Sequence, residues 1–341
     1  MTLLRLTDRG LHCEAGDFYV DPWSPVDRAV VTHAHGDHVA WGCRAYLTSA
    51  EGVGVLRNRL APEARVGGLP YGARSALNGV SLSLHPAGHI LGSSQVRVEY
   101  GGEVWVVSGD YKTDPDPTTT PFESVRCHTF VTESTFGLPI YRWPPQQDVL
   151  RDINTWWRGN QTSGKASLLY GYALGKAQRL LAGLDAGMGP ILTHGAVERM
   201  TAVYRAAGVT LPPTTHAGAV DRRTDWSRAI ILAPPSADGS VWTRRFGPHA
   251  TAFASGWMLV RGARRRRSLD RGFPLSDHVD WPSLMTAVEA TGAERVWVTH
   301  GFTGPVVRWL RDRGLDASAV QTRFEGEVDD DAAGPEDESD R

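Results

Sequence analysis

The sequence predicts an α/β protein made of two joined domains, and three patterns along its 341 residues indicate this fold class. Short apolar strand candidates with turn residues between them fill the first 135 residues. From about residue 146, helical and strand patterns alternate, which is typical of a parallel sheet in a second domain. The strand candidates 29–32 and 295–299 are each followed at once by a histidine, so we expect the C-terminal part of the chain to return to the first domain.

The individual elements follow from hydrophobic periodicity. The first domain holds short runs of apolar and β-branched residues, and its clearest helix is 50–60. Longer helical patterns separate buried strands in the second domain, and a last helix is expected at 281–291. The expected strands are 18–20, 29–32, 45–48, 80–85, 95–100, 104–108, 129–132, 167–170, 191–193, 229–233 and 295–299, and the other expected helices are 147–159, 176–184 and 196–207.

Composition describes an ordinary globular protein, with 41% apolar and 22% charged residues. The three cysteines, Cys13, Cys43 and Cys127, are odd in number and share no C-x-x-C spacing, which argues against a disulfide framework and favours a reducing cytoplasm. No apolar run approaches the roughly 18 residues that cross a bilayer, so we expect no membrane span.

Charge is divided along the chain. Residues 325–341 hold nine acidic residues and one arginine, a net charge of −8, so the rest of the chain carries +6 within the total of −2. Such a tail, poor in large apolar groups, is expected to be disordered. The run Arg261–Arg267 contains five arginines in seven residues, which suits phosphate oxygens if they share a face; a solvated loop is the alternative.

The segment Thr32–His38 reads Thr-His-Ala-His-Gly-Asp-His and predicts a metal pocket. At the end of a strand, period-two geometry would place His33 and His35 on one side, with Asp37 and His38 one turn further on. Packing alone does not require three imidazoles and a carboxylate at this spacing. The alternative is a polar loop whose histidines cap backbone groups.

Three later segments have the same form of a strand followed by a polar residue. His89 lies in a glycine-rich turn, Asp110 follows the strand candidate 104–108, and His300 follows 295–299. Each residue alone is typical of a strand cap. Together with Thr32–His38 they predict one set of metal ligands.

These residues, in this order, resemble the metallo-β-lactamase fold in its nucleic-acid-processing branch, which carries a β-CASP domain. Thr132–Gly137 resembles the acidic motif A of that branch, Ser276–His278 its histidine motif B and Val298–Gly301 its motif C. Tyr172–Gln178 resembles the β-CASP helix start, with Lys176 in place of the usual arginine.

Within the branch, the short β-CASP segment and Asp21-Pro22-Trp23 look most like the bacterial ligase-associated DNA exonucleases, which are related to the mRNA 3′-end processing nuclease and to Artemis-like repair nucleases. The resemblance implies an αββα sandwich with an inserted small α/β β-CASP domain. It implies a metallo-β-lactamase domain formed by residues 1–140 and 269–325 and a β-CASP domain at 141–268, and the charge pattern leaves an acidic tail at 326–341.

The resemblance also implies roles for particular residues. The ligands of one metal would be His33, His35 and His89, those of the other Asp37, His38 and His300, with Asp110 bridging. Nitrogen and oxygen ligands without thiolate suit Zn²⁺, with Mn²⁺ as the alternative. Two divalent ions about 3.5–4 Å apart can activate a water and neutralise charge at phosphorus, which makes Asp37 and Asp110 part of the catalytic set.

A proton for the leaving oxygen would come from His278 oriented by Glu133. Asp21 is expected to orient a metal ligand, with a turn-forming role before proline as the alternative. Phosphate contacts are expected from hydroxyls after motif A, from the start of the helix at 176 and from the arginine run. The expected phosphate-binding residues are Ser134, Thr135, Gly175, Lys176, Arg264, Arg265, Arg266 and Arg267.

The expected function is a DNA exonuclease of DNA repair that acts on single-stranded or recessed ends, associated with a DNA ligase and a helicase. An RNA nuclease of the ribonuclease J or mRNA 3′-end processing type is the alternative, because motif C usually has histidine in RNA members, as at His300 here, and valine in the eukaryotic DNA-repair members. A lactamase or glyoxalase would leave Glu133 and His278 without a role. A binding protein with a dead site would not need the intact ligand set.

Overall fold

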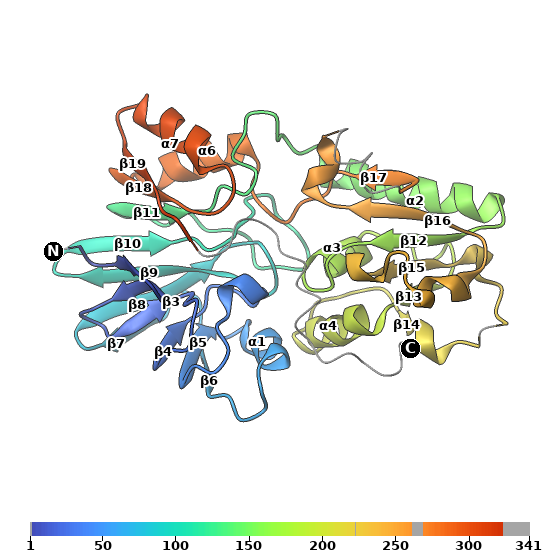
Figure 1. Cartoon of the computed structure of the whole chain (residues 1–341), viewed down its shortest axis with the longest axis horizontal. Helices are drawn as coiled ribbons and strands as arrows, with labels where there is room; N and C mark the ends of the chain where they lie inside the picture. Colours follow the sequence, from blue (N-terminus) through green and yellow to red (C-terminus); the bar gives the residue numbers. More distant parts are fainter. Residues whose placement is uncertain (1, 222, 261–268, 323–341) are drawn as a thin grey trace. The chain divides into compact units, whose positions relative to one another are not determined.

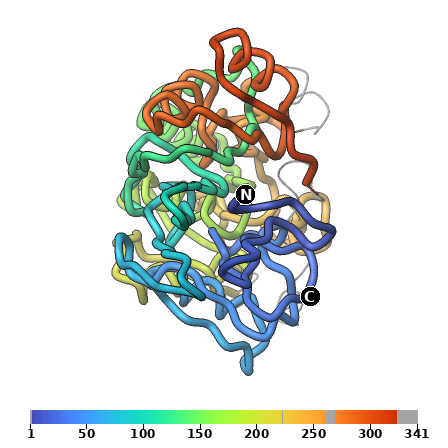
Figure 2. Tube along the Cα trace, turned by 90° about the vertical axis from the view of Figure 1, so that its left-hand side faces the viewer, coloured from blue at the N-terminus to red at the C-terminus, as the bar shows by residue number. Residues whose placement is uncertain are grey.

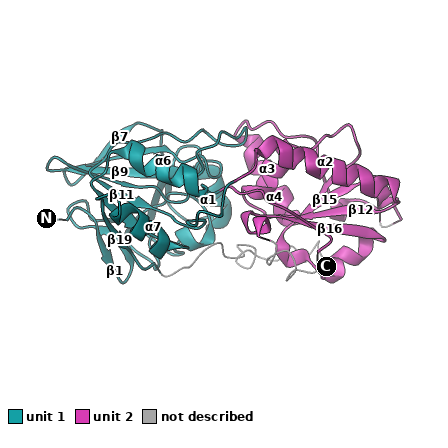
Figure 3. Ribbon diagram, turned by 90° about the horizontal axis from the view of Figure 1, so that it is seen from above, with its two compact units in different colours: residues 1–142, 278–328 teal, residues 143–277, 329–341 magenta. Residues whose placement is uncertain are grey.

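The computed structural model describes residues 2–221, 223–260 and 269–322, and the chain divides into two compact units (Figure 3). Among the described residues, unit 1 comprises 2–142 and 278–322, and unit 2 comprises 143–221, 223–260 and 269–277. The expected α/β class is confirmed, since the described residues form three sheets together with helices. The predicted acidic tail at 326–341 and the predicted phosphate-binding residues Arg264–Arg267 lie outside the described residues.

Unit 1 contains two sheets. In the first, the outer strands β1–β3 pair antiparallel, whereas β3–β6 run parallel. In sheet order its strands are β1 (Arg5–Thr7), β2 (Gly10–Cys13), β3 (Phe18–Val20), β4 (Arg28–Val30), β5 (Ala45–Ser49) and β6 (Val66–Leu69). Helix α1 (Val53–Arg59) joins β5 to β6 (Figure 1).

The second sheet of unit 1 joins the two ends of the chain. Its strands in order are β19 (Asp316–Ala319), β18 (Arg295–Val298), β11 (Thr129–Thr132), β10 (Glu103–Val107), β9 (Ser94–Tyr100), β8 (Val80–Pro86) and β7 (Arg74–Leu77). Because β18 pairs in parallel with β11, the C-terminal segment lies beside strands more than 160 residues earlier in the chain (Figure 2). The expected return of the C-terminal part to the first domain is confirmed.

Strand β10 shows how this sheet is buried on both faces. Successive side chains of a strand point to opposite faces, so Trp105 and Val107 enter the core shared with the first sheet, while Val104 and Val106 enter a second core. That second core is closed by helices α6 (Trp281–Thr291) and α7 (Thr303–Arg311). A strand buried on both faces reads as a continuous apolar run, which is why this one is evident from sequence.

Unit 2 is built on a parallel sheet, as its alternating pattern predicts. Helices α2 (Gln146–Thr162), α3 (Lys176–Ala182) and α4 (Gly195–Ala206) supply apolar side chains to one core of this sheet. Short 3-10 turns, including Trp226–Arg228 and Val241–Phe246, contribute to the core of the opposite face. In sheet order its strands are β14 (Thr215–His216), β13 (Ile191–Thr193), β15 (Ile230–Ala233), β12 (Ala166–Tyr170), β16 (His249–Ala254) and β17 (Arg271–Phe273).

Each of the elements expected from sequence occurs, with shifts of one to three residues at several ends. The elements that were missed lack a strong local pattern: β16 is half alanine, and α7 contains Gly304 and Pro305 in its first turn. The other missed elements are β1, β2, β6, β7, β14, β17 and β19.

Among the described residues, every helix is too short or too polar to span a lipid bilayer.

Candidate metal centre

The histidine motif lies in a loop rather than on a strand. Strand β4 ends at Val30, so the period-two strand geometry that we expected to place His33 and His35 on one side does not apply to them. The loop nevertheless brings their rings together, edge to face with centroids 4.9 Å apart, and places His33 Nε2 3.2 Å from His35 Nδ1. The next residues form a short 3-10 turn, Gly36–His38, which turns the chain back toward the same place.

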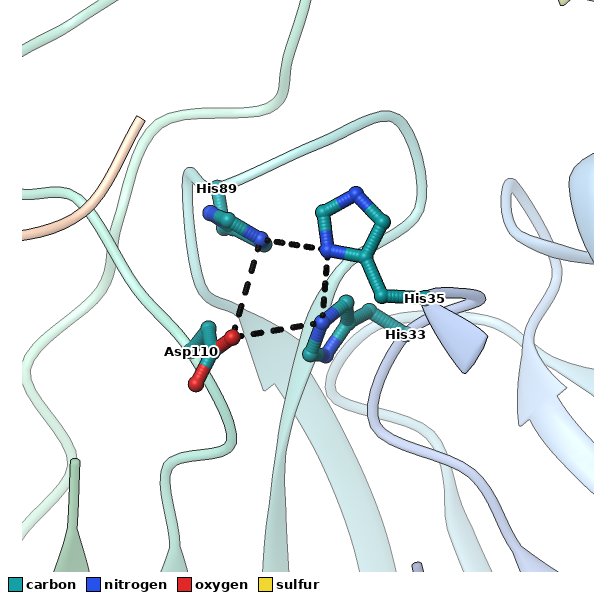
Figure 4. Close-up of side chains that lie close together, drawn as sticks. All are labelled: His33, His35, His89 and Asp110. Atoms are coloured by element: carbon teal, nitrogen blue, oxygen red, sulfur yellow. Dashed lines mark hydrogen bonds and ion pairs between the residues drawn. The ribbon is translucent and has the colours of Figure 1, made fainter. Parts of the chain in front are cut away.

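A first group of ligands comprises His33, His35, His89 and Asp110, whose ligand atoms all lie within 4.8 Å of one another (Figure 4). His89 Nε2 is 3.1 Å from His35 Nδ1 and 3.9 Å from Asp110 Oδ2. The four side chains come from loops after β4, β8 and β10, so three strand ends converge on one point. Nitrogen and carboxylate donors at these separations could hold a divalent ion.

A second group comprises Asp37, His38 and His300. Asp110 Oδ2 lies 3.5 Å from His33 Nε2 in the first group and 3.5 Å from His38 Nε2 in the second. One carboxylate oxygen thus faces both groups, which is the position that a bridging ligand requires. All seven residues predicted as metal ligands therefore converge in unit 1.

Asp21 fixes the orientation of His38. Its Oδ2 accepts a hydrogen bond from His38 Nδ1 at 2.8 Å and another from the Thr32 hydroxyl at 2.6 Å, and its Oδ1 accepts from the Thr32 amide at 2.8 Å. With Nδ1 so engaged, His38 Nε2 is buried and has no hydrogen-bond partner among the described residues. An imidazole with one nitrogen on a carboxylate and the other buried and facing the carboxylates of the ligand groups fits a metal ligand.

The ionisation states of the site follow from burial and from neighbouring charges. Burial, aided by His38, lowers the pKa of His33 well below 6.5, so this ring is neutral and able to ligate. Burial also opposes charge on His38, but Asp37 and Asp110 outweigh it and raise its pKa well above 6.5. Burial would raise the pKa of Asp110, yet His38 and His278 hold it well below 3.8. Asp110 is therefore ionised, and a metal ion bound to His38 would replace a proton.

His278 and Glu133 form a buried pair beside Asp110. His278 Nδ1 lies 2.9 Å from Glu133 Oε2 and 3.1 Å from Oε1, and Oε1 also accepts a hydrogen bond from the Tyr111 amide at 2.8 Å. His278 Nδ1 is 3.9 Å from Asp110 Oδ2. Because Glu133 is held on both sides, it can fix the imidazole with its proton on Nδ1.

The loop that carries His300 is tightly constrained. His300 adopts a left-handed backbone with φ of 50°, and a Cβ on the following Gly301 would lie 2.5 Å from the Ser134 carbonyl oxygen, so only glycine fits there. The Ser134 hydroxyl donates to the carbonyls of Thr299 and His300. Ser134 and Thr135 are both buried, and their predicted contact with phosphate stays a prediction.

Lys176 is buried inside unit 2 and paired there. Its ammonium forms an ion pair with the Asp277 carboxylate and donates to the Leu275 carbonyl oxygen at 3.4 Å. Gly175, at the start of α3, has φ of 85° and donates its amide to the Gln178 side chain at 2.8 Å. The predicted phosphate-binding role of Gly175 and Lys176 stays a prediction, whereas the ion pair gives Lys176 a structural role that sequence did not reveal.

Replacing Lys176 with methionine should destabilise the protein by about 3–5 kcal/mol, because it leaves the buried Asp277 carboxylate without its ammonium partner. Urea unfolding of the purified variant measures this loss. The matched control is Lys165→Met, which removes an exposed lysine from the same unit. A loss below about 1 kcal/mol, the range of an exposed pair, would contradict the structural role.

Two further residues, which the sequence did not indicate, hold the site together. Thr32 binds both oxygens of Asp21, and the Tyr111 amide binds Glu133. The contacts of Thr32 and Tyr111 involve their backbone amides, which every residue except proline has. The residue type therefore does not reveal them. The position of Thr32 next to His33 was the only available indication.

No family model matches the chain. It is 34% identical over 313 residues to a probable DNA ligase of Opitutus terrae, a match that covers 91% of this chain and 30% of the ligase. It is 30% identical over 164 residues to the DNA cross-link repair 1A protein of Homo sapiens, covering 46% and 16% of the two chains. With an endoribonuclease of Emericella nidulans it shares 29% identity over 117 residues, covering 33% and 13%. The chain thus spans less than a third of the length of each of these relatives.

A crystal structure of a protein of unknown function from Enterococcus faecalis V583 is similar with a TM-score of 0.56 at 11% identity, covering 80% of this chain and 74% of the other. That likeness concerns the fold alone. The relatives and the converging ligands place the chain in a known class: it belongs to the β-CASP nuclease family. Within this family, the match along 91% of the chain to a probable DNA ligase fits the ligase-associated nucleases.

Proposed function

We propose that this protein is a two-metal phosphodiester hydrolase, with a metallo-β-lactamase αββα sandwich and an inserted β-CASP domain, that acts as a DNA exonuclease on single-stranded or recessed ends in repair. One observation carries the proposal. Two ligand groups face the same oxygen of Asp110, and the buried His278–Glu133 pair lies beside that carboxylate. Phosphodiester cleavage uses both parts, because it needs charge neutralisation at phosphorus and a proton for the leaving oxygen.

The residues present fit two divalent ions, for which we propose Zn²⁺ with Mn²⁺ as the alternative. When bound, such ions would supply an activated water and neutralise charge on the phosphate. Asp21 holds His38 with Nε2 toward the ligand groups, and Asp110 contributes a negative charge to both of them. Glu133 keeps a proton on His278 Nδ1, so that Nε2 can give its proton to the leaving oxygen.

RNA is the second candidate substrate. The endoribonuclease among the relatives and the histidine at position 300 favour it, whereas the relatives named for DNA ligation and DNA cross-link repair favour DNA. DNA and RNA strands of identical sequence, each labelled at one end, should be incubated with the metal-loaded protein. We expect DNA to be shortened stepwise from one end. Faster cleavage of RNA, or cleavage at internal positions, would contradict the exonuclease proposal.

We also propose that the protein works together with a DNA ligase. The relative that matches nearly the whole chain is named a probable DNA ligase, and this chain corresponds to 30% of it. An exonuclease that removes damaged ends would supply a ligase with clean ones. Association with a helicase stays a prediction from the resemblance, as does phosphate binding by Ser134, Thr135 and the arginines at 264–267.

A further inference from the structure

Trp41 is exposed close to the candidate metal centre. It follows His38 by three residues, and 47% of its surface is accessible. The chain has twelve tryptophans, and Trp41 is the only one among the exposed large apolar residues of the described part. A large aromatic side chain that stays in water keeps its apolar surface available to a ligand, and Trp41 is close in sequence to the ligand His38.

The turn that carries Trp41 is rigid. The buried Tyr46 hydroxyl donates to the Ala40 carbonyl oxygen at 2.8 Å and accepts from the Cys43 amide at 2.9 Å, which ties together the residues on both sides of Trp41. Burial raises the pKa of Tyr46 to about 12, so this hydroxyl keeps its proton at neutral pH. Gly42, with φ of 80°, allows the reversal of the chain. A ring presented on a fixed turn loses little backbone entropy when it binds a ligand.

The position and the neighbours of Trp41 indicate what it binds. Three residues of chain reach at most roughly 11 Å, so Trp41 lies near His38 and the second ligand group. Arg44, exposed on the same turn, offers a cation that suits a phosphate. An exposed aromatic ring together with a cation a few residues away is a combination with which proteins hold unpaired nucleotides, because every base presents a π-face.

We propose that Trp41 is a stacking subsite for an unpaired base next to the phosphodiester that is cleaved. The inference rests on the proposed function and extends it, because it assigns the grip on the strand to a residue of unit 1. It would also favour single strands, as the proposed function requires, since a paired base offers no free face to the ring. If Trp41 served to dock a protein partner instead, Trp41→Ala would bind the strand as well as the unaltered protein does.

The test measures binding of the full-length protein to a fluorescent DNA strand by anisotropy, with divalent ions chelated so that the strand stays intact. Trp41→Ala should raise Kd about tenfold, and Trp41→Phe, which keeps a stacking ring, should raise it about threefold or less. Tyr100→Ala is the matched control, because Tyr100 is exposed to 48% and lies at the turn between β9 and β10. It should leave Kd unchanged.

A second strand with abasic residues along its length identifies the group that stacks. The unaltered protein should bind this strand more weakly than the normal one, and Trp41→Ala should cause no further loss. Equal binding by Trp41→Ala and the unaltered protein on the normal strand would overturn the subsite. So would an equal loss on both strands, or no binding of either strand by the unaltered protein.

Cleavage, assayed separately with metal present, distinguishes the subsite from the proposed function. If the protein binds strands through Trp41 but cleaves none, the subsite stands and the proposed hydrolase is wrong. If it cleaves and Trp41→Ala binds normally, the hydrolase stands and the subsite is wrong.

Discussion

Asp110→Asn should reduce kcat for phosphodiester hydrolysis about a thousandfold or more, the effect of losing several kcal/mol of charge stabilisation. Asp110 Oδ2 lies 3.5 Å from a histidine nitrogen of each ligand group, so its charge serves both. Asparagine keeps the shape of the side chain and removes that charge. Metal content, measured by mass spectrometry on the purified variant, should fall below the roughly two ions per chain expected of the unaltered protein.

The control for this variant is Asp114→Asn, four residues further on. Asp114 is exposed and pairs with Lys112, so its replacement changes the same chemical group in the same loop without touching the ligands. Its metal content and kcat should match those of the unaltered protein. If Asp110→Asn retains about two ions and loses less than tenfold in kcat, Asp110 does not bridge the two groups.

His278→Ala should lower kcat about 10²- to 10⁴-fold while both metals stay bound, because it removes the proton donor and none of the seven predicted ligands. Glu133→Gln should lower kcat less, since the amide still contacts His278 but no longer stabilises its charged form. A nucleotide ester with a p-nitrophenolate leaving group needs no proton, so His278→Ala should hydrolyse it nearly as fast as the unaltered protein does.

His85→Ala is the matched control for the loss of an imidazole. His85 belongs to unit 1 and contacts Ser83 and Glu123 rather than the ligand groups, so its removal should leave kcat and metal content unchanged. The competing role for His278 is that of a ligand, because it also lies in a group with Asp110 and Glu133 that could hold an ion. Metal content that falls in parallel with activity would establish that role instead.

The structure also explains why two separate measurements are needed for these variants. His38 carries a raised pKa because of the carboxylates around it, and the pKa of Asp110 is held low by His38 and His278. Removing one of these charges changes the proton affinity of the others. Activity alone would therefore not separate loss of a ligand from loss of a proton donor, whereas metal content does.

Elements with strong local signals could be predicted closely. Helix α6 begins and ends where expected, at Trp281 and Thr291, because Asp280 caps its first turn and Gly292 ends it in the left-handed conformation. Helix α7 was missed because Gly304 and Pro305 in its first turn resemble a loop. Its helical conformation depends on burying Val306 and Leu310 against the second core of unit 1.

Some features of the candidate site likewise follow from local sequence, and others depend on long-range contacts. His33, His35, Asp37 and His38 could be identified as ligands because their spacing is itself a chemical signal. The contact of Asp21 with His38 joins residues 17 apart, and the ion pair of Lys176 with Asp277 joins residues 101 apart. Such pairs have no local periodicity. The sequence predicted that Asp21 orients a metal ligand but not which one, and Lys176 was interpreted as a phosphate contact without its partner Asp277.

By itself, the sequence determined the α/β class, most element positions and the identity of the residues that converge, because periodicity, caps and ligand spacing are local properties of a chain. The resemblance already implied Asp110 as the bridge and Glu133 as the partner of His278. Only the tertiary structure decided that Lys176 turns inward to Asp277 and that Asp21 binds His38. The physical reason is that burial and long-range pairing set both the pKa values and the partners of these groups, and neither exists until the strands have packed.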